Sequence, residues 1–279
     1  MKISVDESFA PIIQQEIDVF EYTYPDAAIF PEYVSEVEAI TMLLRDSVRL
    51  AVTTRELTAQ EEASLKSKKL NPQTVKIAID GIALIINKQN PDSLIRVSDI
   101  RDILTGKVTE WNQLYPGSKL GKIQLVFDNA NSSTVRFAMD SICKGEPLSP
   151  DLRAQKSNSS VIDHVAQDKS AIGVIGASWI GNPNDTTNLS FSDEITVMSV
   201  SAADVATLSN SYKPYQAYLA LGKYPLIRNV YIILTDAAPR LPVGFTRFVW
   251  SDKGQRIILR SGLVPATQAV RIVNVRDEL

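Results

Sequence analysis

The sequence predicts an α/β protein in which helices cover a mostly parallel sheet. Short β-prone runs alternate with amphipathic stretches, which is typical of βαβ units. With 44% hydrophobic and 22% charged residues, the composition is that of an ordinary globular protein. No apolar run approaches the roughly 18 residues that a membrane span needs. The length of 279 residues exceeds what one hydrophobic core usually needs, so we expect two domains.

The first region alternates strands and helices three times. Apolar side chains at helical spacing predict its first helix, which begins with Ser8 as the N-cap and ends before Pro25. The remaining expected elements are strands at residues 2–6, 28–34 and 48–53 and helices at 35–45 and 58–68.

Residues 75–88 contain two β-prone runs that meet at Asp80 and Gly81. One interpretation is a hairpin, because Asp-Gly is a favoured two-residue hairpin turn. The other is a single strand that passes from one domain into the next.

A second α/β region follows and predicts a second domain. Its first helix is expected to begin at Ser98 as the N-cap. The other expected elements are helices at 132–142, 158–169, 243–250 and 252–261 and strands at 123–127, 171–175 and 228–234.

Charge and residue counts exclude several classes of function. The formal net charge of −3 argues against a generally basic nucleic-acid-binding protein. Cys143 is the one cysteine of the sequence, so no intrachain disulfide can form. His164 is the one histidine, which excludes a zinc site built from several Cys and His ligands. We therefore expect neither a metal nor a cofactor.

Residues 75–112 resemble the phosphate-binding type of periplasmic solute-binding protein, which serves ABC importers. The runs IAIDGIALIINKQNP and LIRVSDIRDILTGKVTEWNQL follow the family pattern of a strand and then a helix. The matching residues, in the family's order, are Asp80, Gly81, Ile82, Ala83, Asn87, Ile100, Ile103, Gly106 and Trp111.

Four later segments extend the resemblance over nearly the whole chain. Each motif is modest alone, but together they stand in the family's order. They are NSSTVRF at 131–137, AIGVI at 171–175, YPLIRNVYI at 224–232 and FVWSDKGQRIILRSGLVP at 248–265.

The resemblance implies a two-lobed type 2 periplasmic binding protein fold, with a mostly parallel sheet in each lobe and two hinge crossovers. Lobe 1 would contain residues 1–79 and 227–279, and lobe 2 residues 80–226. This favours a strand crossover at Asp80 and Gly81 rather than a hairpin. Closure about the hinge would bury a solute between the lobes.

The implied function is capture of an oxyanion, phosphate first, for a membrane ABC permease. The resemblance implies a monomeric binding protein that is not an enzyme and does not bind nucleic acid. It also implies a periplasmic or lipid-anchored location outside the cytoplasm, with an export signal removed before the first residue given.

Two helix starts are the expected anion-binding elements, because the first backbone N–H groups of a helix lack intrahelical partners. In the family both places contact the bound oxyanion. Plain N-capping remains the alternative for their serines. The two segments are Glu7, Ser8 and Phe9, and Ser132, Ser133 and Thr134 after Asn131.

Loops after strands supply the other contacts that the resemblance implies. Thr53, Thr54 and Arg55 follow the third strand, with a surface arginine as the alternative for Arg55. A second matching loop, YVSEVEAI at 33–40, lies earlier in the chain. The family's serine falls there on either Ser35 or Glu36.

The chain departs from the family where an arginine often pairs with phosphate. That position is Asp128, and Arg136 is a candidate replacement, with a solvent-facing side chain as its alternative. With Glu36 and Glu38, Asp128 adds negative charge near the expected cleft. Three interpretations stay open. Some of these carboxylates point away from the cleft, or they pair with Arg55 and Arg136, or the ligand is not phosphate.

Two alternative functions stay open. One is a binding or sensor module that has diverged from transport and takes another small solute. The other is a hydrolase that uses Ser132 or Ser133 with His164 and Asp128, although no GxSxG motif occurs. The apolar face of residues 158–169 leaves His164 on the polar side, which favours a surface histidine.

Overall fold

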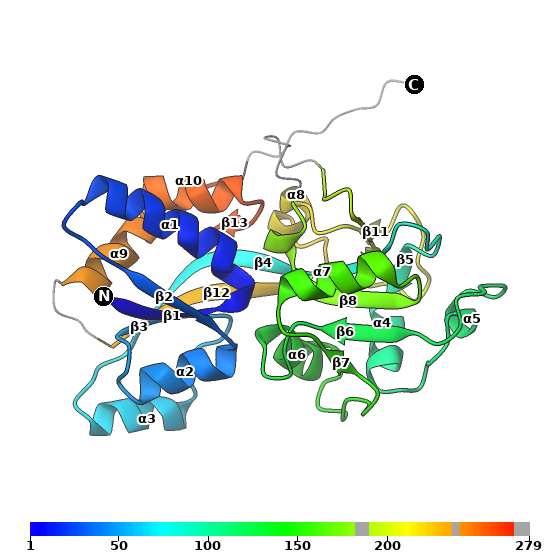
Figure 1. Cartoon of the computed structure of the whole chain (residues 1–279), viewed down its shortest axis with the longest axis horizontal. Coiled ribbons are helices and arrows are strands. Elements are labelled where there is room, and N and C mark those ends of the chain that lie inside the picture. Colours follow the sequence, from blue (N-terminus) through cyan, green and yellow to red (C-terminus); the bar gives the residue numbers. More distant parts are fainter. Residues whose placement is uncertain (182–189, 236–239, 271–279) are drawn as a thin grey trace.

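One ten-stranded sheet runs through both halves of the molecule (Figure 1). The computed structural model describes residues 1–181, 190–235 and 240–270. Within them the main path of the sheet is β2-β1-β3-β12-β4-β8-β6-β7, and β9 and β13 pair with β4. Three further short strands, β11, β10 and β5, form a separate small sheet.

The first half contains the start and the end of the chain. Its strands are β1 (Lys2–Asp6), β2 (Phe30–Val34), β3 (Leu50–Thr53), β12 (Ile227–Leu234) and β13 (Val264–Pro265). Its helices are α1 (Ala10–Thr23), α2 (Glu36–Leu44), α3 (Ala59–Ser67), α9 (Leu241–Trp250) and α10 (Asp252–Arg260), and a 3-10 turn (Glu7–Phe9) precedes α1.

The second half contains the middle of the chain. Its strands are β5 (Leu94–Arg96), β6 (Gln124–Phe127), β7 (Arg153–Ala154), β8 (Ala171–Gly176), β9 (Ile195–Val197), β10 (Ser199–Ser201) and β11 (Ser211–Tyr212). Its helices are α4 (Val97–Leu104), α5 (Trp111–Leu114), α6 (Ser133–Phe137), α7 (Asn158–Gln167) and α8 (Gln216–Ala220). A π-helical turn (Ala138–Ile142) follows α6, and a 3-10 turn (Ala177–Trp179) follows β8.

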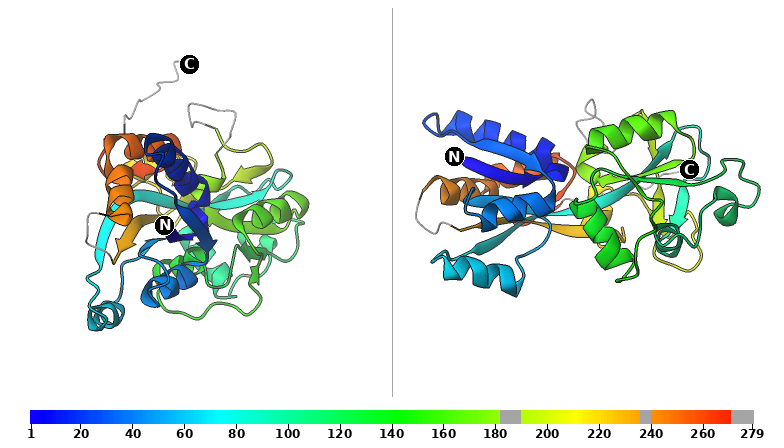
Figure 2. Two further views of the ribbon diagram at one scale, coloured as in Figure 1. Left: turned by 60° about the vertical axis from the view of Figure 1, so that its left-hand side comes forward. Right: turned by 60° about the horizontal axis from the view of Figure 1, so that its bottom comes forward.

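Strand β4 (Gln73–Asn87) joins the two halves without a turn. It pairs with β12 as far as Gly81 and with β8 from Ile82 onward, antiparallel in both cases. The strand crossover is therefore confirmed, and the hairpin at Asp80 and Gly81 is excluded. Figure 2 shows from two other sides that β4 and β12 pass between the halves.

The outer strands pair in parallel, as the alternation predicts. Strand β1 runs parallel to β2 and β3, and β6 runs parallel to β7 and β8. In this sheet the strands around the crossing depart from the pattern, because β12 and β4 are antiparallel to their neighbours. The sheet is therefore mixed, with parallel edges that place several strand ends at the junction between the halves.

Helices cover both faces of each half-sheet (Figure 1). In the first half, α1, α9 and α10 bury one face around Phe9, Ile13 and Phe245, and α2 and α3 bury the other around Leu43 and Leu65. In the second half, residues along β4 alternate between two cores. This period of two is what a strand buried on both faces requires.

Two predicted helix caps are wrong, for local reasons. Asp6 accepts a hydrogen bond from the Ser8 backbone N–H at 3.0 Å, which closes a 3-10 turn, so α1 begins only at Ala10. Pro11 then fits the first turn of α1 because a helix start needs no N–H there. Ser98 lies inside α4, since Asp99 accepts from the Arg96 backbone N–H and the helix begins at Val97.

Candidate functional site

The ends of several strands meet at the junction between the halves. Strand β1 ends at Asp6, β3 ends at Thr53, and Asp128 directly follows β6. In open α/β sheets, ligands bind outside the carboxyl ends of the strands. The junction is therefore the expected position of a binding site.

Two serines and an arginine form the centre of this junction. The Ser8 Oγ of the first half lies 3.4 Å from the Ser133 Oγ of the second. Arg228 on β12 donates from Nη1 to Ser133 Oγ at 2.7 Å and from Nε to Asp80 Oδ2 at 2.9 Å. The Phe9 ring lies 5.2 Å from the guanidinium carbon. Ser8, Ser133 and Asp80 have no exposed surface, so this is a fully desolvated cluster of donors.

Several buried polar atoms at the junction have no hydrogen-bond partner among the described residues. They are one donor, Arg228 Nη2, and three acceptors, Asp6 Oδ2, Asp80 Oδ1 and Asn158 Oδ1. An unpaired buried polar group costs free energy, so such groups are rare in native structures and call for an explanation. Gly176 lies against the free donor, since a Cβ there would stand 3.3 Å from Arg228 Nη2. The cluster can therefore satisfy a guest that both accepts and donates hydrogen bonds.

Burial also changes the protonation of the carboxyl groups at the centre. Desolvation raises the pKa of Asp6 to about 7, although the nearby Arg228 charge opposes this shift. Desolvation likewise raises the pKa of Asp80 against the effect of its ion pair with Arg228. Burial therefore favours the protonated form of Asp6, which reduces the negative charge of the site.

A second contact between the halves is an ion pair. Arg136 on α6 donates from Nε to Glu36 on α2 at 2.6 Å and from Nη2 to Thr54 Oγ1 at 2.6 Å. Glu36 also accepts from the Thr54 backbone N–H and hydroxyl, both at 2.7 Å. Burial alone would raise the pKa of Glu36, but Arg136 and the Thr54 donors hold that pKa below its usual value. Glu36 is therefore a charged partner for Arg136 and joins α2 to α6.

A third contact is centred on Asn158 at the start of α7. Its side-chain amide donates to Glu7 of the first half and, at 3.4 Å, to Asp128. Asp128 also accepts from the Thr134 hydroxyl. Burial raises the pKa of Glu7 against the effect of the Asn158 hydrogen bonds. Glu36 and Asp128, two of the predicted negative charges, thus accept hydrogen bonds from protein donors.

The carbonyl oxygen of Ser8 adds a fourth contact. It accepts from Ser178 Oγ at 2.9 Å and from the Trp179 indole at 3.0 Å. These hydrogen bonds link the halves at the junction, and Gln216 of α8 adds two more to the Leu259 and Leu263 carbonyls, so the structure describes the halves in a closed arrangement.

The structure brings most of the predicted site residues to the junction. Each of these residues contacts the other half, the serine and arginine centre, or another residue of the junction. They are Glu7, Ser8, Phe9, Glu36, Thr54, Asp128, Ser133, Thr134 and Arg136.

The other four predicted residues make local contacts. Ser35 caps α2 through the Glu38 backbone N–H at 3.3 Å, and Ser132 caps α6 in the same way. The Thr53 hydroxyl donates to the Arg55 carbonyl at 2.8 Å. The Arg55 guanidinium donates twice to Glu61, each at 2.7 Å, at the start of α3.

Sequence reasoning missed Asp6, Asp80, Asn158 and Arg228 as members of the site. For Asp80 and Arg228 a signal was present, because each is a charged residue in or beside a run of apolar strand residues. A charge in such a run is buried when the strand is buried, and a buried charge needs a partner. Asn158 carried no comparable signal, since asparagine is common at helix starts.

The hydrolase arrangement is not assembled. In the described part of the chain, no hydrogen bond connects His164 with Ser132, Ser133 or Asp128. His164 lies instead beside a surface hollow that Lys119 and Asp168 also line.

The fold and the junction define a two-lobed type 2 periplasmic binding protein, a class of binding proteins rather than of enzymes. The chain belongs to the family described as the PBP superfamily domain, whose model matches residues 1–253. None of the described helices combines the length and apolar character that crossing a membrane requires.

Two curated relatives resemble the chain over most of its length. The phosphate-binding protein PstS of Pseudomonas aeruginosa is 23% identical over 283 residues, which cover 93% of this chain and 80% of that protein. PstS of Staphylococcus aureus is 22% identical over 254 residues, which cover 88% of this chain and 72% of that protein.

Solved structures share the fold. A substrate-binding protein from Clostridium perfringens with bound phosphate matches with a TM-score of 0.79 at 21% identity, covering 96% of this chain and 100% of its own. An ABC-type phosphate transport receptor from Vibrio cholerae matches with a TM-score of 0.70 at 21% identity, covering 95% of this chain and 100% of its own.

Proposed function

We propose that the protein captures an oxyanion between its two lobes and delivers it to an ABC importer. Phosphate is the leading candidate for this oxyanion. The observation that carries this proposal is the buried Arg228 guanidinium. Its Nη2 has no acceptor among the described residues, and its Nη1 donates to Ser133 Oγ, which lies 3.4 Å from Ser8 Oγ. A guanidinium and two hydroxyls form a donor set that matches a tetrahedral oxyanion. The names of the curated relatives and the phosphate-bound structural neighbour support phosphate as the ligand.

The unpaired acceptors favour an oxyanion that carries a proton. Asp6 Oδ2 and Asn158 Oδ1 are buried and need donors. Phosphate is protonated at neutral pH and can donate, whereas sulfate carries no proton. We therefore expect phosphate to bind and sulfate to bind poorly.

The site residues would then have distinct roles. Ser8, Ser133 and Arg228 would contact the oxyanion, with the backbone at Phe9 and Thr134 beside it. Glu36, Thr54 and Arg136 would hold the lobes together. We assign less direct roles to the locally engaged Ser35, Thr53, Arg55 and Ser132.

The lobe boundaries, partner and location belong to the same proposal. Lobe 1 would be residues 1–79 and 227–279, and lobe 2 residues 80–226. The change of β4 pairing partner after Gly81 supports this division. The protein would act as a monomer outside the cytoplasm and dock on a membrane permease, in periplasmic or lipid-anchored form.

Calorimetry on ligand-stripped protein tests the proposal. We expect saturable heat with phosphate and little with sulfate. Ser133→Ala should weaken phosphate binding about tenfold, because one hydrogen bond to a charged ligand is worth about 1.4 kcal/mol or more. Ser67→Ala is the matched control, since Ser67 lies at the end of α3 and donates only to the Ser64 carbonyl. No heat with phosphate would refute phosphate as the ligand and leave the fold unaffected.

A divergent binding or sensor module is the second candidate. Five carboxyl groups lie at the junction against two arginines, which is an unusual balance for an anion site: Asp6, Glu7, Glu36, Asp80 and Asp128 against Arg136 and Arg228. Native mass spectrometry of protein purified without denaturation separates the two candidates. A co-purified solute other than phosphate would favour the second.

A further inference from the structure

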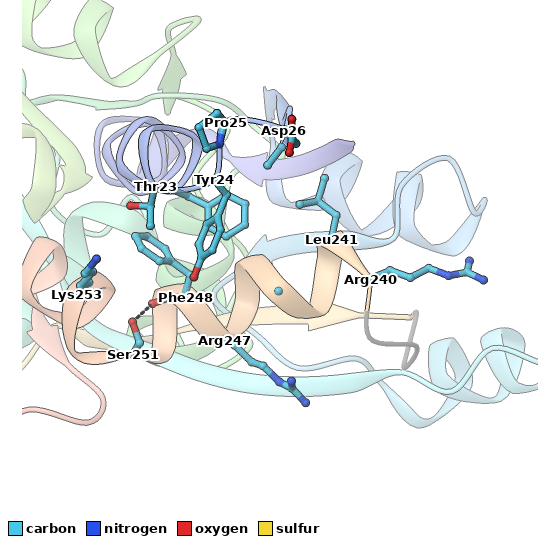
Figure 3. A pocket seen from close by; sticks show the side chains of 13 residues that line it. Thr23, Tyr24, Pro25, Asp26, Arg240, Leu241, Arg247, Phe248, Ser251 and Lys253 are labelled. Atoms are coloured by element: carbon cyan, nitrogen blue, oxygen red, sulfur yellow. Dashed lines mark hydrogen bonds between the residues drawn. The ribbon is translucent and has the colours of Figure 1, made fainter.

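A hollow lies on the first half, at the end of α1, and none of the junction residues lines it. Figure 3 shows the side chains that form it. The hollow has a volume of about 850 Å³ and is open to solvent on one side. Small-molecule sites usually measure about 300–1,000 Å³. The end of α1, the loop that follows it and helix α9 enclose the hollow.

Aromatic and aliphatic side chains form most of its wall. The buried Phe20 ring packs 5.3 Å from the Phe248 ring and 4.9 Å from the Tyr24 ring, and about half of the Tyr24 surface stays exposed. Figure 3 shows the rings of Tyr24 and Phe248 beside each other and Leu241 at some distance along α9. The wall therefore offers an apolar surface that is already fixed by packing.

Gly244 on α9 has no side chain to fill this part of the hollow. It lies one turn from both Leu241 and Phe248, so it shares their side of the helix. Glycine is the poorest helix former after proline, and a Cβ at this position would meet no atom within 4 Å. Packing within the protein therefore does not require glycine here, and the missing side chain leaves space in the hollow.

The border of the hollow is basic. Arg247 and Lys253 both line it, and neither makes an ion pair or hydrogen bond within the residues that the structure describes. Arg240 also lines it, and Asp26 is the one carboxylate among the described residues of its lining. The charge next to the apolar wall is therefore complementary to an anion.

We propose that this hollow binds a single-chain amphiphile with an anionic head. Its apolar chain lies against Tyr24, Leu241 and Gly244, and its head group lies at the basic border of the hollow. The volume of the hollow suits one small molecule of this kind. The site is separate from the junction and does not depend on the proposed capture of phosphate.

Titration with four twelve-carbon amphiphiles, each below its critical micelle concentration, tests this inference. Dodecanoate and dodecyl phosphate carry anionic heads, dodecyltrimethylammonium a cationic head, and dodecyl maltoside a neutral one. We expect the two anionic compounds to bind saturably, and the cationic and neutral ones at least tenfold more weakly.

Two variants locate the binding. Gly244→Leu should weaken dodecanoate binding at least tenfold, because its side chain fills the hollow, while thermal unfolding confirms that the variant is folded. The double variant Arg247→Gln and Lys253→Gln should weaken it about tenfold. The control is Lys122→Gln with Arg153→Gln, which removes two exposed charges from the second half. Phosphate titration of each variant should be unchanged.

Three results would overturn the proposal. They are equal binding of the cationic amphiphile, undiminished dodecanoate binding by Gly244→Leu, and absence of saturable dodecanoate binding. Self-association in sedimentation that Gly244→Leu abolishes, without dodecanoate binding, would identify the hollow as an interface between two copies instead.

Discussion

The buried carboxyl groups of Asp6 and Glu16 have different surroundings. Asp6 lies near Arg228 and accepts the Ser8 backbone N–H. Glu16 lies on α1 with no exposed surface, and neither of its carboxylate oxygens has a partner in the described residues. Burial therefore raises the pKa of Glu16 to about 9, and the folded protein keeps this group neutral.

The raised pKa of Glu16 gives stability a pH dependence. The unfolded chain releases this proton near pH 4.5, whereas the folded chain holds it until about pH 9. The contribution of Glu16 to stability is therefore complete below pH 4.5 and declines as pH rises toward 9. The decline is about 1.4 kcal/mol per pH unit from this group alone.

Glu16→Gln should remove this slope, because glutamine does not titrate. Urea unfolding at pH 5 and pH 8 measures the free energy of unfolding of both proteins. Between pH 5 and pH 8, the free energy of unfolding of the variant should rise by about 2–4 kcal/mol relative to that of the wild type. An equal difference between the proteins at both pH values would contradict the account of Glu16.

At the scale of elements, the strands and helices were largely predictable and their exact starts were not. The alternation of β-prone and amphipathic runs predicts the order of elements, because each pattern reflects which face is buried. Helix starts depend on single side-chain contacts, such as Asp6 with Ser8 and Asp99 with Arg96. The sequence gives no direct sign of which of two neighbouring polar residues accepts the bond.

The start of α3 separates a structural role from a binding role. Thr58 and Glu61 form a capping box, and Arg55 pairs with Glu61. Arg55→Gln should therefore change phosphate affinity less than twofold, whereas Thr58→Ala should cost about 1 kcal/mol of stability. Calorimetry and thermal unfolding measure the two effects. A tenfold loss of phosphate affinity in Arg55→Gln would contradict this structural role and indicate that Arg55 contacts the ligand.

At the scale of the whole molecule, the two halves are joined by covalent crossings and by direct contacts. Strands β4 and β12 cross between them, and the buried Arg228–Asp80 pair ties these strands together at 2.9 Å. Arg136 with Glu36 and Thr54, and Asn158 with Glu7, hold the halves closed beside the crossing. The protein therefore has internal contacts that favour closure.

Arg136→Gln should shift the ligand-free protein toward an open form. Losing the charge-assisted hydrogen bonds of a half-buried arginine costs about 2 kcal/mol, or about thirtyfold in the closed-to-open ratio. Small-angle X-ray scattering should show a larger radius of gyration. Arg101→Gln is the matched control, since its partner Glu146 lies in the same half. Identical scattering from Arg136→Gln and the control would contradict this role.

The resemblance predicted which segments meet at the junction better than the hydrogen bonds between them. The starts of α1 and α6 were expected to face one ligand, and Ser8 and Ser133 do lie 3.4 Å apart. The pairing of Glu36 with Arg136 was one of the open alternatives, because sequence does not show which charges meet across a junction. Arg228 stands in the motif YPLIRNVYI, but its role depends on contacts with Ser133 and Asp80. These two residues lie 95 and 148 positions away from it in the sequence.

Crystallography with arsenate tests the central claim most directly. Arsenate is a protonated tetrahedral oxyanion like phosphate, and anomalous scattering locates its arsenic atom. We expect one strong anomalous peak between the lobes, with arsenate oxygens about 2.7–3.2 Å from Arg228 Nη2, Ser8 Oγ and Ser133 Oγ. A peak found only elsewhere, or none in crystals grown at saturating arsenate, would contradict the claim.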